Sequence, residues 1–196
     1  FPLASRIESR IRYTGYVSDQ QPVANRPRHR AGPIVVSAGG GFFGERLLRT
    51  AIEAYSVYEP SSSLRRRPWH VLVGPNLPSE RFDALRAKAS GSLWIERNRD
   101  DFHQLLAGCS VSVSQGGYNT IVDLLSLRVA ALVVPYEDDS EREQAVRAAA
   151  LARRGLLEVL SYRALNPINL AHAINAVDQG PGMPPISVNL DGARNS

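Results

Sequence analysis

A pair of glycines between a strand and a helix is the part of this sequence best suited to bind a ligand. Gly116 and Gly117 stand between a small, apolar run (109–113) and an amphipathic run that begins at Thr120. This order directs free backbone N–H groups and the positive end of a helix dipole at an anion. The glycines let a ligand approach the backbone closely, and Asn119 and Thr120 add side-chain donors. The alternative is a turn that needs glycine only for its backbone angles.

Acidic and amide side chains further along could bind the hydroxyl groups of a sugar. Asp123 lies one helical turn after Asn119 and Thr120, so it should face the same end of the helix. Because a carboxylate opposes phosphate binding, its expected ligand is a ribose diol. The alternative is an acidic residue that only favours the helix dipole. Glu143 and Gln144 are candidates for the hydroxyls of a sugar, with a solvated first helical turn as the alternative.

Other residues at predicted strand ends add weaker signals. Gly39, Gly40 and Gly41 follow a β-branched run and resemble a phosphate-binding loop, although the Lys of a P-loop and the spacing of a dinucleotide fingerprint are missing. Ser114 ends the run that leads to the paired glycines.

Two further segments at strand ends have open interpretations. Arg97 and Asn98 follow a short apolar run, where the backbone could contact a nucleobase or form a solvated turn. For the acidic loop 137–141, a solvated turn is the prediction. The four histidines lack the spacing of a metal site, and no Ser-His-Asp or Cys-His arrangement is present, so we expect no metal, no cofactor and no catalytic residue in this chain.

The elements that position these residues alternate between strands and helices. β-branched and apolar runs predict buried strands, and apolar residues at helical spacing separate them. This rhythm predicts an α/β, Rossmann-like open parallel sheet of about six strands with helices on both faces. Ligands of such sheets bind at the carboxyl ends of the strands. The predicted strands are 11–17, 34–37, 69–73, 93–95, 109–113, 130–135 and 156–160. The predicted helices begin near residues 47, 79, 100, 120, 140 and 167.

Composition describes an ordinary globular chain. It has 196 residues, 43% of them hydrophobic and 21% charged, and no apolar run reaches the length of a membrane span. Cys109 is the single cysteine, which favours a reducing, cytoplasmic setting. The net charge of +4 comes from scattered arginines without an aromatic-interleaved basic stripe, so we expect no nucleic-acid partner. Arg65, Arg66 and Arg67 are predicted to lie in a solvated loop, with contact to anionic lipid as the minor alternative.

Taken together, these segments resemble the C-terminal, donor-binding half of a GT-B glycosyltransferase. The resemblance is to the family-28 group that includes the peptidoglycan lipid-intermediate N-acetylglucosaminyltransferase. It extends over roughly residues 11–177. The segments that carry it are 13–16, 34–41, 113–120 with Asp123, 131–136, and 143–144 with Ala148, Leu151 and Gly155.

The resemblance implies a nucleotide-diphosphate sugar, above all a UDP-sugar, as the ligand. By likeness, Gly116 and Gly117 with Asn119 and Thr120 hold the diphosphate, and Asp123 binds the ribose hydroxyls. By the same likeness, the glycine-rich loop that begins at Gly39 faces the pyrophosphate, Glu143 and Gln144 contact the donor sugar, and Arg97 and Asn98 occupy the base-recognition position. The family often has apolar residues at this last position, and the loop before Glu143 is about one residue longer here, so base and sugar stay open.

The resemblance also implies a division of labour between two domains. Residues 1–17 are expected to be an interdomain linker with a strand, 18–32 a polar loop, 33–178 the binding domain and 179–196 an irregular tail. The general base and the acceptor site would belong to a missing N-terminal domain, so the isolated domain is expected to bind donor without turnover. The full-length protein could contact a membrane peripherally. The alternatives are a nucleotide-sugar 2-epimerase of the same fold and a non-enzymatic nucleotide- or partner-binding module.

Overall fold

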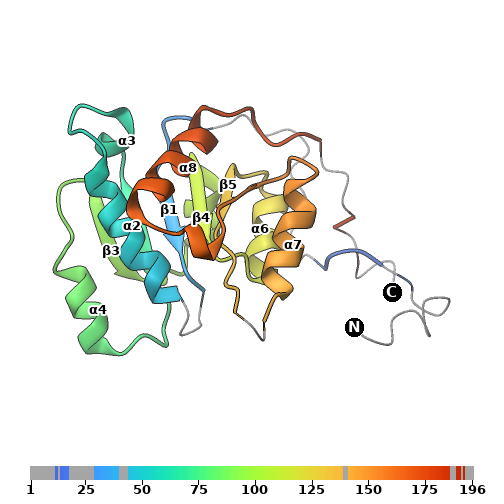
Figure 1. The fold of residues 1–196 in the computed structure, drawn as a ribbon, viewed down its shortest axis with the longest axis horizontal. Helices are drawn as coiled ribbons and strands as arrows, with labels where there is room; N and C mark the ends of the chain where they lie inside the picture. The colour runs from blue at the N-terminus through green and yellow to red at the C-terminus, as the bar shows by residue number, and fades with distance from the viewer. Residues whose placement is uncertain are drawn as a thin grey trace.

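The computed structural model describes residues 12, 14–17, 29–39, 44–138, 141–185, 189, 190 and 192. In this part of the chain, a six-stranded sheet lies between two layers of helices (Figure 1). The strands are β1 (Ile34–Ser37), β2 (Trp69–Val73), β3 (Leu93–Arg97), β4 (Val111–Ser114), β5 (Ala131–Val133) and β6 (Glu158–Val159). The helices are α2 (Glu45–Val57), α3 (Ser63–Arg66), α4 (Ser79–Arg86), α5 (Phe102–Gly108), α6 (Tyr118–Ser126), α7 (Glu143–Ala152) and α8 (Pro167–Gln179), with a 3₁₀ turn, η3 (Tyr162–Ala164). The predicted α/β architecture is confirmed.

The strand order is that of a doubly wound sheet. The strands lie in the order β3-β2-β1-β4-β5-β6, and every pair is parallel. The chain therefore builds outward from β1 to β3, returns to place β4 beside β1, and builds outward again. At this reversal Ser37 pairs in register with Ser114, each at the carboxyl end of its strand. Ligands of open α/β sheets bind in the crevice at such a switch point.

Both faces of the sheet are covered at its centre, which explains the apolar runs of strands such as β1 and β5. Ile34 and Val36 of β1 belong to a core formed with α2, α4 and α8. Val35, which points to the opposite face, belongs to a second core formed with α5, α6 and α7. The sheet is therefore a rigid central layer that fixes the loops at its carboxyl edge.

Several element boundaries differ from the sequence prediction. The last strand is limited to Glu158–Val159, which are exposed at the sheet edge, whereas five residues were expected. The helix expected from residue 140 begins at Glu143, and the helix cap expected at Ser79 falls on Pro78 instead. In the segment predicted as a first strand, residues 11 and 13 lie outside the described residues and residues 14–16 are not in a strand.

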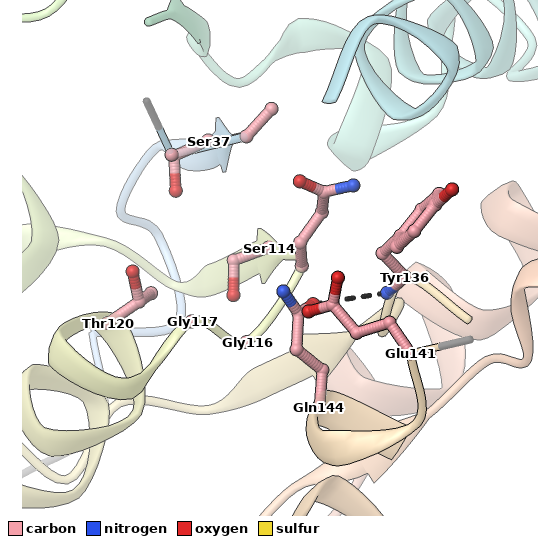
Figure 2. A pocket seen from close by; sticks show the side chains of 11 residues that line it. Ser37, Ser114, Gly116, Gly117, Thr120, Tyr136, Glu141 and Gln144 are labelled. Atoms are coloured by element: carbon pink, nitrogen blue, oxygen red, sulfur yellow. Dashed lines mark hydrogen bonds between the residues drawn. The ribbon is translucent and has the colours of Figure 1, made fainter. Parts of the chain in front are cut away.

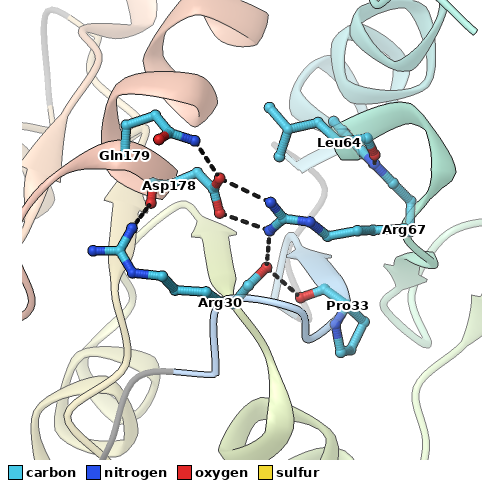
Figure 3. A network of polar contacts seen from close by, with 8 residues as sticks. Arg30, Pro33, Leu64, Arg67, Asp178 and Gln179 are labelled. Carbon is cyan, nitrogen blue, oxygen red and sulfur yellow. Dashed lines mark hydrogen bonds and ion pairs between the residues drawn. The ribbon is translucent and has the colours of Figure 1, made fainter. Parts of the chain in front are cut away.

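The arginine cluster is where the sequence prediction is wrong. Residues 63–66 form the short helix α3, and the side chain of Arg67, which is 13% exposed, is largely buried instead of solvated. Figure 3 shows its two hydrogen bonds to the carboxylate of Asp178, with N–O distances of 2.6 and 2.9 Å. Arg67 also donates to the hydroxyl of Ser110, which in turn donates to the carbonyl of Pro33. Because Pro33 precedes β1 and Ser110 precedes β4, this network closes the amino edge of the sheet.

None of the helices described in the structure is long and apolar enough to cross a membrane.

Candidate functional site

A cavity of about 180 Å³ opens at the switch point of the sheet. Three loops line it, which follow β1, β4 and β5, and the first turns of α6 and α7 complete it (Figure 2). Its lining residues are Ser37, Ala38, Gly39, Ser114, Gln115, Gly116, Gly117, Thr120, Tyr136, Glu141 and Gln144. The carboxyl ends of three neighbouring strands therefore converge on one small, polar space.

The two glycines after β4 have different structural roles. Gly116 has φ +77°, and a Cβ there would lie 2.6 Å from Cγ1 of Val133, so this position requires glycine for the fold. Gly117 has φ −54°, which any residue adopts, and a Cβ there would have no described atom within 4 Å. The need for a turn therefore explains Gly116 and not Gly117. At Gly117 the missing side chain leaves open space beside the backbone of the cavity wall.

The first turn of α6 supplies backbone donors to this space. Gly117 occupies the cap position, and no side chain among the described residues caps the helix. The first N–H groups of a helix have no partner within it, and the helix dipole places partial positive charge there. Because α6 has nine residues, this end is a suitable site for an anion.

Hydroxyl groups surround the same corner. Ser114 is 2% exposed, and its hydroxyl has no hydrogen-bond partner in the described structure, although it belongs to the cavity wall. Figure 2 shows Ser114 and Thr120 with Gly117 between them. A buried hydroxyl without a partner costs free energy, which a ligand oxygen in the cavity would recover. The orphaned hydroxyl of Ser114 is therefore a candidate partner for a polar ligand in the cavity.

The α7 side of the cavity presents an amide. The Oε1 atom of Gln144 accepts a hydrogen bond of 3.1 Å from the backbone N–H of Tyr136. This bond fixes the orientation of the amide and turns its NH₂ group toward the cavity (Figure 2). The backbone of Glu141 is held by two hydrogen bonds with Asp138, one through N–H and one through C=O. The α7 side therefore offers one oriented donor and one carboxylate acceptor.

Size and charge limit what the cavity can hold. Sites for whole small molecules usually measure about 300–1,000 Å³, so this space fits part of a ligand. Among the described lining residues Glu141 alone is charged, and no Lys or Arg contributes. An anion would therefore be held by N–H groups, hydroxyls and the helix dipole. The rest of the ligand would extend over the rim.

Comparison with known proteins identifies the family. Residues 69–184, more than half of the chain, match the model of the glycosyltransferase family 28 C-terminal domain. The chain belongs to this family. Over 158 residues it is 29% identical to a UDP-N-acetylglucosamine–N-acetylmuramyl-(pentapeptide) pyrophosphoryl-undecaprenol N-acetylglucosamine transferase of Exiguobacterium sp., covering 80% of this chain and 42% of that protein. An uncharacterised glycosyltransferase of Methanopyrus kandleri is 26% identical over 74% of this chain and 38% of its own length.

Solved structures of GT-B glycosyltransferases share the fold of this family 28 domain. MurG of Acinetobacter baumannii superimposes with a TM-score of 0.59 at 17% identity, covering 79% of this chain and 45% of MurG. The calicheamicin glycosyltransferase CalG4 has a TM-score of 0.57 at 20% identity, covering 91% of this chain and 42% of CalG4. The chain spans about two fifths of the length of the curated relatives it matches.

The structure brings about half of the predicted site residues of this family 28 domain together. The predicted residues that line the cavity are Gly39, Ser114, Gly116, Gly117, Thr120 and Gln144. Gly40 and Gly41 lie outside the described residues. Asn119 is exposed and does not line the cavity. Glu143 is 75% exposed and pairs with Arg147 one turn along α7.

Asp123 lies on α6 beyond the cavity wall and is half-buried. Burial raises the pKa of its carboxyl, and the nearby His103 acts in the opposite direction. A carboxylate that has lost part of its hydration gains more from hydroxyl donors than an exposed one. This environment is compatible with the predicted ribose contact.

The predicted base-recognition pair lies at the end of β3, outside the cavity. Nη1 of Arg97 donates to the carbonyls of Gly74 and Leu77, at 3.2 and 2.9 Å, and its guanidinium stacks on Phe82. The backbone N–H of Asn98 donates to the carbonyl of Val73. In this arrangement Arg97 holds the loop after β2 in place.

Five lining residues were absent from the predicted site: Ser37, Ala38, Gln115, Tyr136 and Glu141. Ser37 could have been found, because it ends β1 as Ser114 ends β4. Gln115 lies next to the glycine pair and is nine-tenths buried. Tyr136 and Glu141 belong to the loop after β5, and no local pattern of the sequence distinguishes their position from that of their exposed neighbours.

Proposed function

We propose that this domain binds a nucleotide-diphosphate sugar, with a UDP-sugar as the first candidate, and serves as the donor-binding half of a glycosyltransferase. The observation that carries the proposal is the corner at Gly117, where an open backbone, an uncapped helix end and the orphaned hydroxyl of Ser114 meet. Family membership supports the same conclusion, because relatives over this region are named as UDP-N-acetylglucosamine transferases.

Each part of the donor has a place in this arrangement. The diphosphate would accept hydrogen bonds from the N–H groups at Gly117 and the first turn of α6 and from the hydroxyls of Ser114 and Thr120. The ribose diol would reach Asp123, and the sugar would lie toward Gln144. Because the cavity holds only part of a ligand, the nucleoside would extend over the rim past Asp123.

The proposed chemistry is transfer of the glycosyl group to an acceptor hydroxyl. As the bond between the anomeric carbon and the diphosphate oxygen breaks, negative charge grows on the leaving diphosphate. Donors at the α6 corner would stabilise that charge in the transition state more than in the bound donor. Among the described residues that line the cavity there is no histidine, and Glu141 carries the one carboxylate. An acceptor hydroxyl also needs a general base. We assign that group to a second domain, so the domain alone would bind donor and not turn it over.

Calorimetric titration of this chain with UDP-N-acetylglucosamine and with UDP tests the proposal. Saturable one-to-one binding that competes between the two ligands is expected. Parallel titrations with GDP- and ADP-sugars identify the base preference. The absence of heat and of any thermal shift at millimolar ligand would favour the alternative of a non-enzymatic module.

A 2-epimerase of the same fold would bind the same donor, so binding does not distinguish it from a transferase. An activity assay of the full-length protein distinguishes the two enzymes. A transferase releases UDP only when acceptor is present, whereas an epimerase converts the sugar without acceptor.

A further inference from the structure

Two segments from opposite ends of the chain meet beside the donor corner. The backbone N–H of Tyr16 donates to the carbonyl of Asn189 at 2.8 Å, and the N–H of Gly192 donates to the carbonyl of Tyr16 at 2.9 Å. The side-chain amide of Asn189 also donates to the carbonyl of Thr14. We call residues 14–17 with Asn189 and Gly192 the clasp.

Close backbone contact shows that the clasp is specifically packed. Gly15 has φ +111°, and a Cβ there would lie 2.7 Å from the carbonyl oxygen of Asn189. A Cβ on Gly192 would lie 2.6 Å from the carbonyl oxygen of Gly15. Side chains are therefore excluded at both positions. A displacement of residues 14–17 would therefore also displace Asn189 and Gly192.

Tyr118 connects the clasp to the donor corner. Its hydroxyl accepts a hydrogen bond of 3.1 Å from the backbone N–H of Val17, and its ring lies against that of Tyr16 with centroids 5.6 Å apart. Tyr118 is also the first residue of α6 and directly follows Gly117 in the cavity wall. Its side chain therefore contacts the clasp, while the backbone to which it is attached forms the corner.

The same tyrosine also contacts the α7 side of the site. The guanidinium of Arg147 lies 5.6 Å from the centre of the Tyr118 ring and pairs with Glu143 in the first turn of α7. The next residue, Gln144, lines the cavity. Tyr118 thus lies between the clasp and both helix starts that frame the ligand space.

We propose that Tyr118 is a positioning residue that couples the clasp to the donor corner. This inference rests on the proposed donor site. Ligand bound at Gly117 fixes the first turn of α6, which fixes the Tyr118 ring and thereby orders residues 14–17. By reciprocity, the clasp must favour the same arrangement of the corner that the ligand favours. If residues 1–17 are the linker predicted from the sequence, this contact reports donor occupancy to a second domain.

Hydrogen–deuterium exchange on this chain, with and without saturating UDP-N-acetylglucosamine, tests the coupling. In the wild type, ligand should slow exchange at 115–118 and also at 14–17, although 14–17 does not line the cavity. Tyr118→Phe removes the acceptor of the Val17 N–H and keeps the ring. Val17→Pro removes the donor and leaves α6 unchanged. Both variants should keep the protection at 115–118, lose it at 14–16 and weaken binding by about fivefold.

Tyr58→Phe is the matched control, because the Tyr58 hydroxyl also makes a hydrogen bond to a backbone group, the carbonyl of Ala171, and neither residue lines the cavity. It should bind ligand and show protection as the wild type does. Protection at 115–118 without protection at 14–17 in the wild type would overturn the coupling alone, as would unchanged protection at 14–16 in Tyr118→Phe. Absence of protection at 115–118 would overturn the donor site and, with it, the coupling.

Discussion

Replacing Ser114 by alanine should weaken donor binding and raise the stability of the free protein. Ser114 is 2% exposed and lines the cavity, and its hydroxyl has no partner in the described part of the chain. In the free protein it is desolvated without compensation. In the complex it would donate to a charged phosphate oxygen. The substitution should therefore act in opposite directions on the two states.

The magnitudes follow from the two environments. A hydrogen bond to a charged group contributes about 1.5–3 kcal/mol, which corresponds to an increase in Kd of about 10- to 150-fold. An unsatisfied buried hydroxyl costs about 1–3 kcal/mol. Its removal should raise Tm by about 2–4 °C for each kcal/mol in a domain of this size.

Ser112 provides a matched control on the same strand. It lies two residues earlier on the same face of β4, is fully buried and also has an unpartnered hydroxyl, but it does not line the cavity. Ser112→Ala should raise Tm and leave the Kd for UDP-N-acetylglucosamine unchanged. Calorimetry and thermal unfolding measure both quantities. Equal Kd values for Ser114→Ala and the wild type, or equal weakening by both substitutions, would refute the assignment of Ser114.

Five other substitutions test three separate parts of the account. Gly117→Ala should keep the free energy of unfolding within about 1 kcal/mol of the wild-type value and raise the Kd at least tenfold. Gly116→Ala should lower the free energy of unfolding by about 1–3 kcal/mol. A lower Tm for Gly117→Ala than for Gly116→Ala would contradict this. Burial raises the pKa of Asp123, so ionisation of this carboxyl lowers the stability of the protein as the pH rises above the ordinary carboxyl range. Asp123→Asn should therefore have an equal or higher Tm than the wild type at pH 8, and the difference should vanish at low pH. The same substitution should raise the Kd about 10- to 100-fold. Arg67→Ala leaves the buried carboxylate of Asp178 without its cation and should lower the free energy of unfolding by about 3–5 kcal/mol. This loss would be measured as a lower Tm with an unchanged Kd. Arg66 is exposed, so Arg66→Ala should change neither quantity.

Much of the sheet could be predicted because its strands are buried on both faces. Short, largely apolar runs such as Ile34–Ser37 and Trp69–Val73, buried along their whole length, allow few other structures. Prediction failed where distant residues decide the structure. The local sequence predicts Arg67 to be part of a solvated cluster, because Asp178, whose carboxylate pairs with it, is 111 residues away in the sequence.

The site shows the same division between local and distant causes. The glycine pair could be found because strand, turn and helix are adjacent in the sequence. The sequence could not predict which of Glu143 and Gln144 faces the cavity. Neighbouring residues of a helix point about 100° apart, and the residue at which the helix starts determines which of them points inward. The structure places Gln144 in the cavity wall and Glu143 against Arg147.

The central claim is that the corner at Gly116 and Gly117 binds a diphosphate. The most direct test is an amide NMR titration of ¹⁵N-labelled protein with UDP-N-acetylglucosamine. The amide signals of Gly116, Gly117 and the first turn of α6 should shift most, in a saturable way, and UDP should produce the same shifts. Unperturbed signals at this corner, with the largest shifts elsewhere or with none at millimolar ligand, would contradict the claim.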